Sequence, residues 1–244
     1  MAGQPADTDA LRLWFNPPDD GESGRRALTR ERVVAEALTI IAADGAQALS
    51  MRALAARLGV VPGALYRHVR GKEQLYDLIL DAVLGEVDCR TDPAAPWAAQ
   101  VAALAGRLRA VLENRPGTAA LLKTRDPLSP ASLELAEAFL APLLAAGLPG
   151  RDAAVAFRLV YDYTLGFALA DPTSPAERRL RDTATRQQLH AFFRALPASR
   201  FPALAANGVH AWDGDRDQRF AAGLDTLLRG IEADMRPSGA SGES

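Results

Sequence analysis

Helix-forming residues dominate this sequence, and Pro or Gly interrupts them at intervals of about one helix length. Val and Ile are scattered, and no stretch alternates apolar and polar residues as a half-buried strand requires. Because 48% of its 244 residues are hydrophobic, the chain can bury the core of one large or two modest domains. The pattern predicts an all-α protein of roughly nine or ten helices, without a sheet.

The ends of the chain and its cysteine content indicate the compartment. Residues 1–24 and 236–244 are rich in Asp, Gly, Pro and Ser, which predicts disordered tails. Cys89 is the only cysteine, so an intrachain disulfide is excluded and a reducing cytosol is expected. Asp7 and Asp9 stand where a signal peptide needs a basic start, and the apolar runs are too short to span a membrane. We therefore expect a cytoplasmic protein.

Charge is distributed unevenly along the chain. Residues 24–72 hold nine Lys and Arg against three Asp and Glu, a net charge of +6. Since the whole chain carries −2, the remainder carries −8. A basic end on an acidic body favours a protein that meets a polyanion at one end only.

The stretch LGVVPGALYRHVRGKEQL, which begins at Leu58, breaks a helical pattern that resumes on either side. We expect Ser50 to cap a short helix that ends at Gly59, where a residue without a Cβ most easily becomes left-handed. Pro62 suits the first position of a second short helix, which we expect to end near Val69. The inward positions of the two helices are Leu54, Leu58, Leu65 and Val69. Two such helices form a helix-turn-helix, whose second helix enters the major groove of DNA.

An ordinary helical bundle with a solvated charged face is the alternative interpretation. The coincidence of Gly59, Pro62 and inward leucines with the local positive charge favours the DNA-binding one.

The same signals place the remaining helices. The first runs from an N-cap at Thr29 to about Asp44 and is ended by Gly45, and the fourth opens at 71–72 and runs to about Val87. Inward positions of the first helix are Val34, Leu38 and Ile41, and those of the fourth are Leu75, Leu78, Ile79 and Val83. Further helices are predicted near 97–113, 117–124, 130–146, 150–169, 175–196 and 213–235, with a loop at 197–212. The predicted domains are a tail (1–24), a DNA-binding domain (25–72) with a linking helix (72–88), a regulatory and dimerisation domain (89–235) and a tail (236–244).

The segment LSMRALAARLGVVPGALYRHVRGKEQL resembles the DNA-binding part of the TetR family, specifically its tetracycline-repressor branch. It matches L-x-x-R-x-L-A-x-x-L-G-V-x-x-x-x-L-Y-x-H-V-x-x-K without gaps. The resemblance covers residues 28–85, and RFAAGLDTLLRGIEA at 219–233 is similar to the last helix of that branch. It implies a transcriptional regulator, by default a repressor, that is a homodimer, binds double-stranded DNA and is released by a small-molecule effector.

The resemblance also implies roles for individual residues in DNA binding. Arg52 matches a residue that reads a base edge, and Tyr66, His68 and Lys72 match contacts to the DNA backbone. Pro62, Gly63 and Ala64 occupy the base-facing start of the recognition helix. This chain has Val61 where many relatives have Ser or Thr, so a cap and a hydroxyl–phosphate bond are lost. Specificity is then expected to rest on Arg52, Arg67 and methyl contacts from Ala64. Tyr66 as a core aromatic and His68 as a structural residue remain the alternatives.

The segment after residue 89 is expected to dimerise and to bind the effector. The last helix carries one broad apolar stripe, and 155–170 is apolar nearly all round, so the two are expected to form a four-helix dimer interface; packing in the core is the alternative. The dimer residues are Phe220, Leu224, Leu227, Leu228 and Ile231. Effector candidates are Trp97, Val101, Leu104, Leu108, Leu121, Arg125, Phe139, Phe157 and Tyr161, although a stripe of Leu or Phe more often belongs to the core than to a cavity.

The effector is expected to bind without a metal ion or another cofactor. In the tetracycline repressor a histidine just upstream of a Thr-Arg pair helps to bind the magnesium–drug chelate. Here Leu121 and Leu122 precede that pair, and no histidine lies between His68 and His190. Leucine offers a divalent cation no ligand. We expect a largely apolar organic effector, with Arg125 or Tyr161 orienting its polar end.

Two other functions are compatible with an all-α chain of this kind. A DNA-bound dimer without a small-molecule effector would have the same DNA-binding domain. An enzyme is not favoured, because motifs of the types GxSxG, HExxH, CxxC, GxGxxG and GxxxxGK are absent from the sequence.

Overall fold

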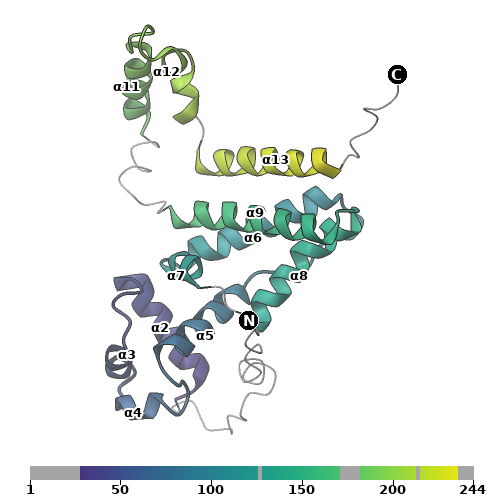
Figure 1. Ribbon diagram of the computed structural model, residues 1–244. Helices are drawn as coiled ribbons and strands as arrows, with labels where there is room; N and C mark the ends of the chain where they lie inside the picture. The colour runs from purple at the N-terminus through teal and green to yellow at the C-terminus, as the bar shows by residue number, and fades with distance from the viewer. Residues whose placement is uncertain (1–27, 126–127, 171–181, 213–214, 236–244) are drawn as a thin grey trace, which may run out of the picture. The chain divides into compact units, whose positions relative to one another are not determined.

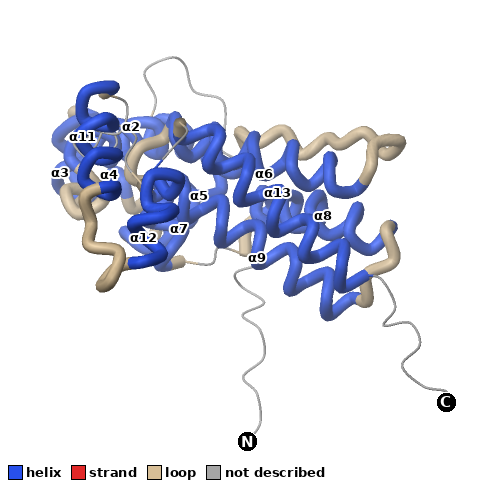
Figure 2. Tube along the Cα trace, turned by 90° about the horizontal axis from the view of Figure 1, so that it is seen from above, coloured by secondary structure: helices blue, strands red, loops and turns tan. Residues whose placement is uncertain are grey.

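The computed structural model describes residues 28–125, 128–170, 182–212 and 215–235. These residues form helices and connecting loops, without a strand among them, as Figure 2 shows. The all-α prediction is confirmed. The two predicted tails lie outside the described residues. The chain divides into two compact units, the first ending at Leu143 and the second beginning at Leu144.

The first unit begins with the four helices of the DNA-binding segment (Figure 1). These are α2 (Arg30–Asp44), α3 (Met51–Leu58), α4 (Pro62–Leu65) and α5 (Lys72–Leu84). Thr29 Oγ1 accepts a hydrogen bond of 3.2 Å from the backbone N–H of Arg32 and so begins α2, which Gly45 ends with a φ of 80°. The predicted bounds of the first two helices are therefore confirmed.

Two predicted helix ends in this segment are wrong. The recognition helix stops at Leu65 rather than near Val69, and α5 stops at Leu84 rather than near Val87. The backbone after Leu65 continues as turns, with His68 N–H and Val69 N–H both bonded to Leu65 O. An apolar residue at helical spacing predicts a buried side chain, and Val69 is buried. The spacing does not show that the helix itself continues as far as that residue.

The core of the first unit is made by α5 packing against α2, α6 (Trp97–Asn114) and α7 (Thr118–Thr124). Nearly all the predicted inward positions are buried; they are Val34, Ile41, Leu54, Leu58, Leu65, Val69, Leu75, Leu78, Ile79 and Val83. Leu38 is the exception, because it is only half-buried. Tyr76, which the sequence pattern did not single out, is buried and donates a hydrogen bond of 3.0 Å to Ala46 O.

Helix α8 (Pro130–Ala145) crosses from the first unit to the second, where α9 (Gly150–Leu169) and α13 (Arg216–Met235) run side by side (Figure 1). An aromatic cluster joins α9 to α13. The Tyr163 ring stacks on the Phe220 ring at 5.5 Å between centroids, and Tyr163 Oη donates 2.9 Å to Phe220 O. The buried Arg216 donates to Phe167 O near the end of α9. These contacts fix the register of the two helices.

The predicted loop at 197–212 is wrong. It contains α12 (Pro202–Asn207) and the 3-10 helix η1 (Gly208–Trp212), and both pack against α11 (Thr183–Arg194). Pro202 occupies the first helical turn, where proline begins a helix rather than breaking it. Gly208 is close-packed, since a Cβ there would overlap the Phe193 ring.

Candidate nucleic-acid interface

Helix α3 is fixed at both ends by backbone geometry that its sequence encodes. Ser50 Oγ accepts 3.1 Å from Ala53 N–H. Gly59 ends the helix in the left-handed conformation, with φ 69° and ψ 31°. Leu54, Leu58 and Leu65 hold α3 and α4 in the core, so the helices joined by this turn present their polar residues outward. Figure 1 shows α3 and α4 as consecutive short helices at this end of the first unit.

The start of α4 carries no polar side chain toward solvent. Val61 precedes it with 71% of its surface exposed and makes no side-chain cap. Pro62 and Gly63 are exposed, and Ala64 is half-buried. This end of the helix can approach base edges closely, but it offers them shape and methyl contacts rather than hydrogen bonds.

The predicted polar contacts lie on α3 and in the residues that follow α4, and they differ in exposure. Arg52 and Arg67 are exposed, and Tyr66 has 55% of its surface exposed, so the core interpretation of Tyr66 is wrong. His68 is half-buried, and its Nδ1 is fully buried with no hydrogen-bond partner among the described residues. The half-buried imidazole and the exposed phenol are therefore different kinds of candidate for the DNA backbone.

The beginning of α5 follows the helix-turn-helix in the chain and is a candidate anion site. Gly71 stands at the N-cap and supplies no side-chain acceptor, so the first turn of this 13-residue helix keeps free N–H groups. Lys72 is half-buried, with Nζ 5.4 Å from the centroid of the Tyr76 ring. A phosphate placed there would meet both an ammonium group and the helix dipole.

Arginine side chains near the interface are not equivalent. Arg57, on the same helix as Arg52, is paired with Glu36 of α2 at 2.5 Å between Nε and Oε1. No ion pair of Arg52 is found within the described chain, and its side chain is exposed. The pairing leaves Arg52 as the α3 cation available for a base edge.

Comparison with known proteins identifies the family of both the N-terminal and the C-terminal parts of the chain. Residues 33–79 match the model for "Bacterial regulatory proteins, tetR family", and residues 91–235 match "Tetracyclin repressor-like, C-terminal domain". The chain belongs to the TetR family. It is accordingly a DNA-binding transcriptional regulator, and its TetR relatives are regulators rather than enzymes.

Similar TetR proteins cover most of the chain. An HTH-type transcriptional regulator of Saccharopolyspora erythraea is 35% identical over 221 residues, or 91% of each chain. The HTH-type transcriptional repressor DrrR1 of Streptomyces coeruleorubidus is 30% identical, over 90% of this chain and 83% of that one. The crystal structure of Streptomyces coelicolor ActR in complex with actinorhodin has a TM-score of 0.75 at 32% identity and covers 86% of this chain and 99% of that one.

The predicted effector residues fall into two groups. Trp97, Val101, Leu104, Leu108, Leu121, Arg125 and Phe139 belong to the first compact unit, and Phe157 and Tyr161 to the second. Within the second unit, the Phe157 and Tyr161 rings lie 5.8 Å apart between centroids. In the first unit, the apolar members of the group other than Trp97 are buried.

Arg125 is held by the linking helix α5. Its guanidinium contacts the Glu73 carboxylate, lies 3.3 Å from Asp77 Oδ1 and covers the Tyr76 ring at 4.7 Å from the centroid. Burial raises the pKa of Asp77, although the Arg125 charge opposes this. The Tyr76 ring thus contacts both the Lys72 ammonium group and the Arg125 guanidinium. The spacing of four residues between Lys72 and Tyr76 could have indicated the first of these contacts.

The predicted dimer residues are largely enclosed within one chain. Phe220, Leu224, Leu228 and Ile231 are buried in the single chain, and Leu227 is half-buried. The large apolar side chains that α9 leaves exposed are Val155 at 61% and Leu159 at 45%, and both belong to the stretch 155–170 that was expected at the dimer interface. Their spacing of four residues places them on one face of the helix.

Metal-binding clusters and membrane-spanning helices are absent from the part of the chain that the structure describes. No group of three or more His, Cys, Asp and Glu that could hold a metal ion occurs among these residues. Within the same residues, no helix combines the length and apolar character needed to cross a membrane.

Proposed function

We propose that this chain is a homodimeric repressor that reads a near-palindromic operator and is released by a metal-free, mostly apolar effector. The observation that carries the proposal is an exposed Arg52, which has no ion pair among the described residues, on the helix that precedes the apolar tip Val61–Gly63 and the uncapped start of α5. In this arrangement Arg52 reads a base edge, while the α5 N-terminus and Lys72 hold phosphates and fix the register.

Dimerisation supplies the second half-site. One four-residue recognition helix touches too few bases for specific binding, so the two α4 helices of a dimer would lie about 34–36 Å apart. The exposed Val155 and Leu159 of α9 support association through this helix and α13. The predicted stripe of α13 would then hold this helix in place within its own chain; its residues are Phe220, Leu224, Leu227, Leu228 and Ile231.

The effector is assigned to the apolar region around α6 and α7. Supporting residues, all in the first unit, are Trp97, Val101, Leu104, Leu108, Leu121 and Phe139. Arg125, the candidate in the same unit for orienting the polar end of the effector, is already paired with carboxylates of α5, so an effector that used it would compete with Glu73 and Asp77. ActR, a relative, was crystallised with actinorhodin, which supports an organic effector for this chain too.

Operator selection from a random duplex pool, followed by light scattering, tests DNA binding and assembly. We expect a two-fold symmetric consensus and a particle of about twice the 26.0 kDa chain at micromolar concentration. A monomer that bound DNA tightly would overturn the dimer.

Fluorescence anisotropy of the resulting complex tests the effector. We expect hydrophobic metabolites with a chelator to release the DNA, and tetracycline with magnesium to leave it bound. The reverse pattern would overturn the metal-free assignment, since the leucines before Thr124 offer no metal ligand.

A DNA-binding dimer without an effector is the second candidate. Val101, Leu104, Leu108 and Phe139 are all 0% exposed, as expected of a filled core. Thermal denaturation against a metabolite panel separates the two functions, because a ligand that binds the native state raises the melting temperature. A panel without any such ligand, on protein that binds its operator, would favour the second candidate.

A further inference from the structure

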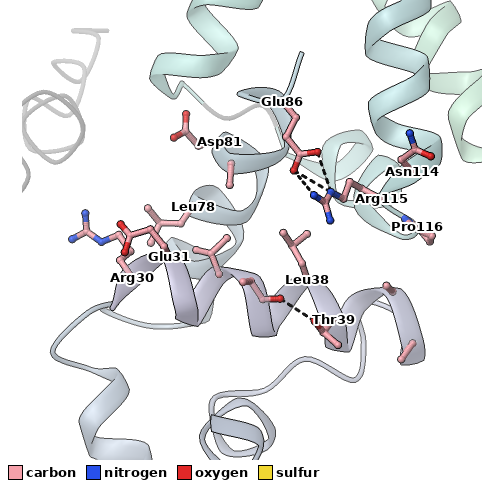
Figure 3. A pocket seen from close by; sticks show the side chains of 15 residues that line it. Arg30, Glu31, Leu38, Thr39, Leu78, Asp81, Glu86, Asn114, Arg115 and Pro116 are labelled. Carbon is pink, nitrogen blue, oxygen red and sulfur yellow. Dashed lines mark hydrogen bonds and ion pairs between the residues drawn. The ribbon is translucent and has the colours of Figure 1, made fainter. Parts of the chain in front are cut away.

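A cavity of about 980 Å³ lies in the first unit, and none of the residues that line it is among those assigned to the effector (Figure 3). Its walls are α2, α5 and the turn Asn114–Pro116 that follows α6. The volume is that of pockets for drug-sized molecules, roughly 300–1,000 Å³. It is therefore large enough for an organic ligand in addition to the one that the proposed function requires.

Small residues of both helices create the space. The cavity is lined by Ala35, Ala42 and Ala43 of α2 and by Ala82 of α5, all exposed. Leu38 and Leu78 lie between them and provide an apolar middle, which Figure 3 shows as two leucines on facing helices. This explains why Leu38, expected in the core, is only half-buried: it faces the cavity. A flat apolar molecule would fit between the two helices.

One end of the cavity has its charges neutralised within the protein. Glu86 and Arg115 form an ion pair of 2.7 Å between Oε1 and Nη2, as Figure 3 shows at the right. The pair ties the end of α5 to the turn after α6, so this end needs no counter-ion from a ligand.

The other end has an unused donor. Arg30 Nε is buried and has no hydrogen-bond partner among the described residues. Of the nearby carboxylates, Asp81 Oδ1 accepts 3.0 Å from Ala131 N–H. Hydrogen bonds from its own backbone and from Thr29 lower the pKa of Glu31, and the Arg30 charge lowers it further, but Glu31 does not accept from Arg30 Nε. A buried donor without an acceptor is costly, and an anionic group placed there would accept from it.

We propose that this cavity is a second ligand site, for an amphipathic organic anion whose apolar body lies between Leu38 and Leu78 and whose anionic group accepts from Arg30. Such a ligand would touch the first helix of the DNA-binding segment and the turn after α6 at the same time. The proposal does not depend on the identity of the effector, and operator binding without any ligand is measured separately, so either can fail alone.

The test uses two fluorescent probes on the full chain: 1-anilinonaphthalene-8-sulfonate, and N-phenyl-1-naphthylamine, which has the same rings without the sulfonate. We expect saturable binding of the sulfonate. Arg30→Ala should weaken it about ten-fold and leave the neutral probe unchanged, because only the sulfonate uses the guanidinium. The control is Arg32→Ala. Arg32 is an exposed arginine, next to Glu31 in sequence, that does not line the cavity.

Filling the cavity provides the independent arm. Ala35→Phe should weaken both probes, and Ala42→Phe should repeat the effect if the first variant melts early. Ala110→Phe, at an exposed alanine of α6 outside the cavity, should change neither probe. Unchanged binding in both filled variants would overturn the site.

Discussion

Gly117 lies against Ile41: a Cβ built on this glycine would stand 2.8 Å from Ile41 Cγ2 and 3.3 Å from Ile41 O. The turn before α7 and the last part of α2, more than seventy residues apart in sequence, thus meet with no room for a methyl group. Gly117 also has a φ of +84°, which side chains other than glycine rarely adopt.

Gly117→Ala should therefore destabilise the protein by about 2–4 kcal/mol, through both backbone strain and overlap with Ile41. Gly147→Ala is the matched control, because Gly147 has a φ of +96° with nothing within 4 Å of its Cβ position. It should cost only the strain, about 1 kcal/mol. Urea denaturation of both variants gives the difference, and equal losses would contradict the close approach.

Gly223→Ala tests the contact between α9 and α13 in the same way. Its Cβ would collide with the Tyr163 hydroxyl, which donates to Phe220 O, so we expect a loss of about 1–3 kcal/mol. Gly230→Ala, in the same helix with nothing within 4 Å, should instead gain about 1 kcal/mol from helix propensity. Thermal melts that shift in the same direction for both variants would refute the assigned packing.

Arg52→Ala should reduce operator affinity by about 1–3 kcal/mol and relax the preference at one base pair in each half-site. Arg57→Ala, on the same helix but engaged with Glu36, should leave sequence preference intact. Selection of operators by the two variants is the measurement. An Arg52 variant that lost affinity with an unchanged consensus would show that this residue holds the backbone instead.

Lys72→Ala should weaken binding to all sequences alike, because phosphates carry no sequence information. The slope of log K against log salt concentration should fall by about one charge. Affinities measured between 50 and 200 mM salt, roughly the range over which phosphate contacts dominate, give this slope. A parallel salt plot would remove Lys72 from the interface.

Acid stability tests the loop that joins α5 to α6. Two hydrogen-bonding groups of Arg90, its side chain and its backbone N–H, hold the pKa of Asp88 well below its usual value. A carboxyl whose pKa is lowered on folding stabilises the protein above its unfolded pKa of about 3.9, and this stabilisation is lost as the pH falls further. Asp88→Asn should therefore melt at a lower temperature than the wild type at pH 7, with the gap closing toward pH 2. A constant gap would contradict the linkage.

The sequence predicted correctly those helix boundaries that are set by interactions between neighbouring residues. Ser50, Gly59 and Thr29 act through bonds to neighbours a few residues away, so their helix boundaries followed directly. The positions of Arg125 and Tyr76 depend on packing between segments separated by 48 and 30 residues, which periodicity does not encode. The same holds for the dimer stripe, since an apolar face predicts burial without saying whether a partner or the chain itself covers it.

The contacts of α5 have a practical consequence for chimaeric regulators. Helix α5 is attached on one side to α2 and on the other to α6 and α7, with Tyr76 and Leu78 buried among them. A fusion made at residue 72, intended to transfer the DNA-binding specificity of this protein to another scaffold, would expose the surfaces that α5 buries and would separate Lys72 from the Tyr76 ring. A module that could be transferred intact would have to continue through α7. It would therefore be longer than the segment that is expected to contact DNA.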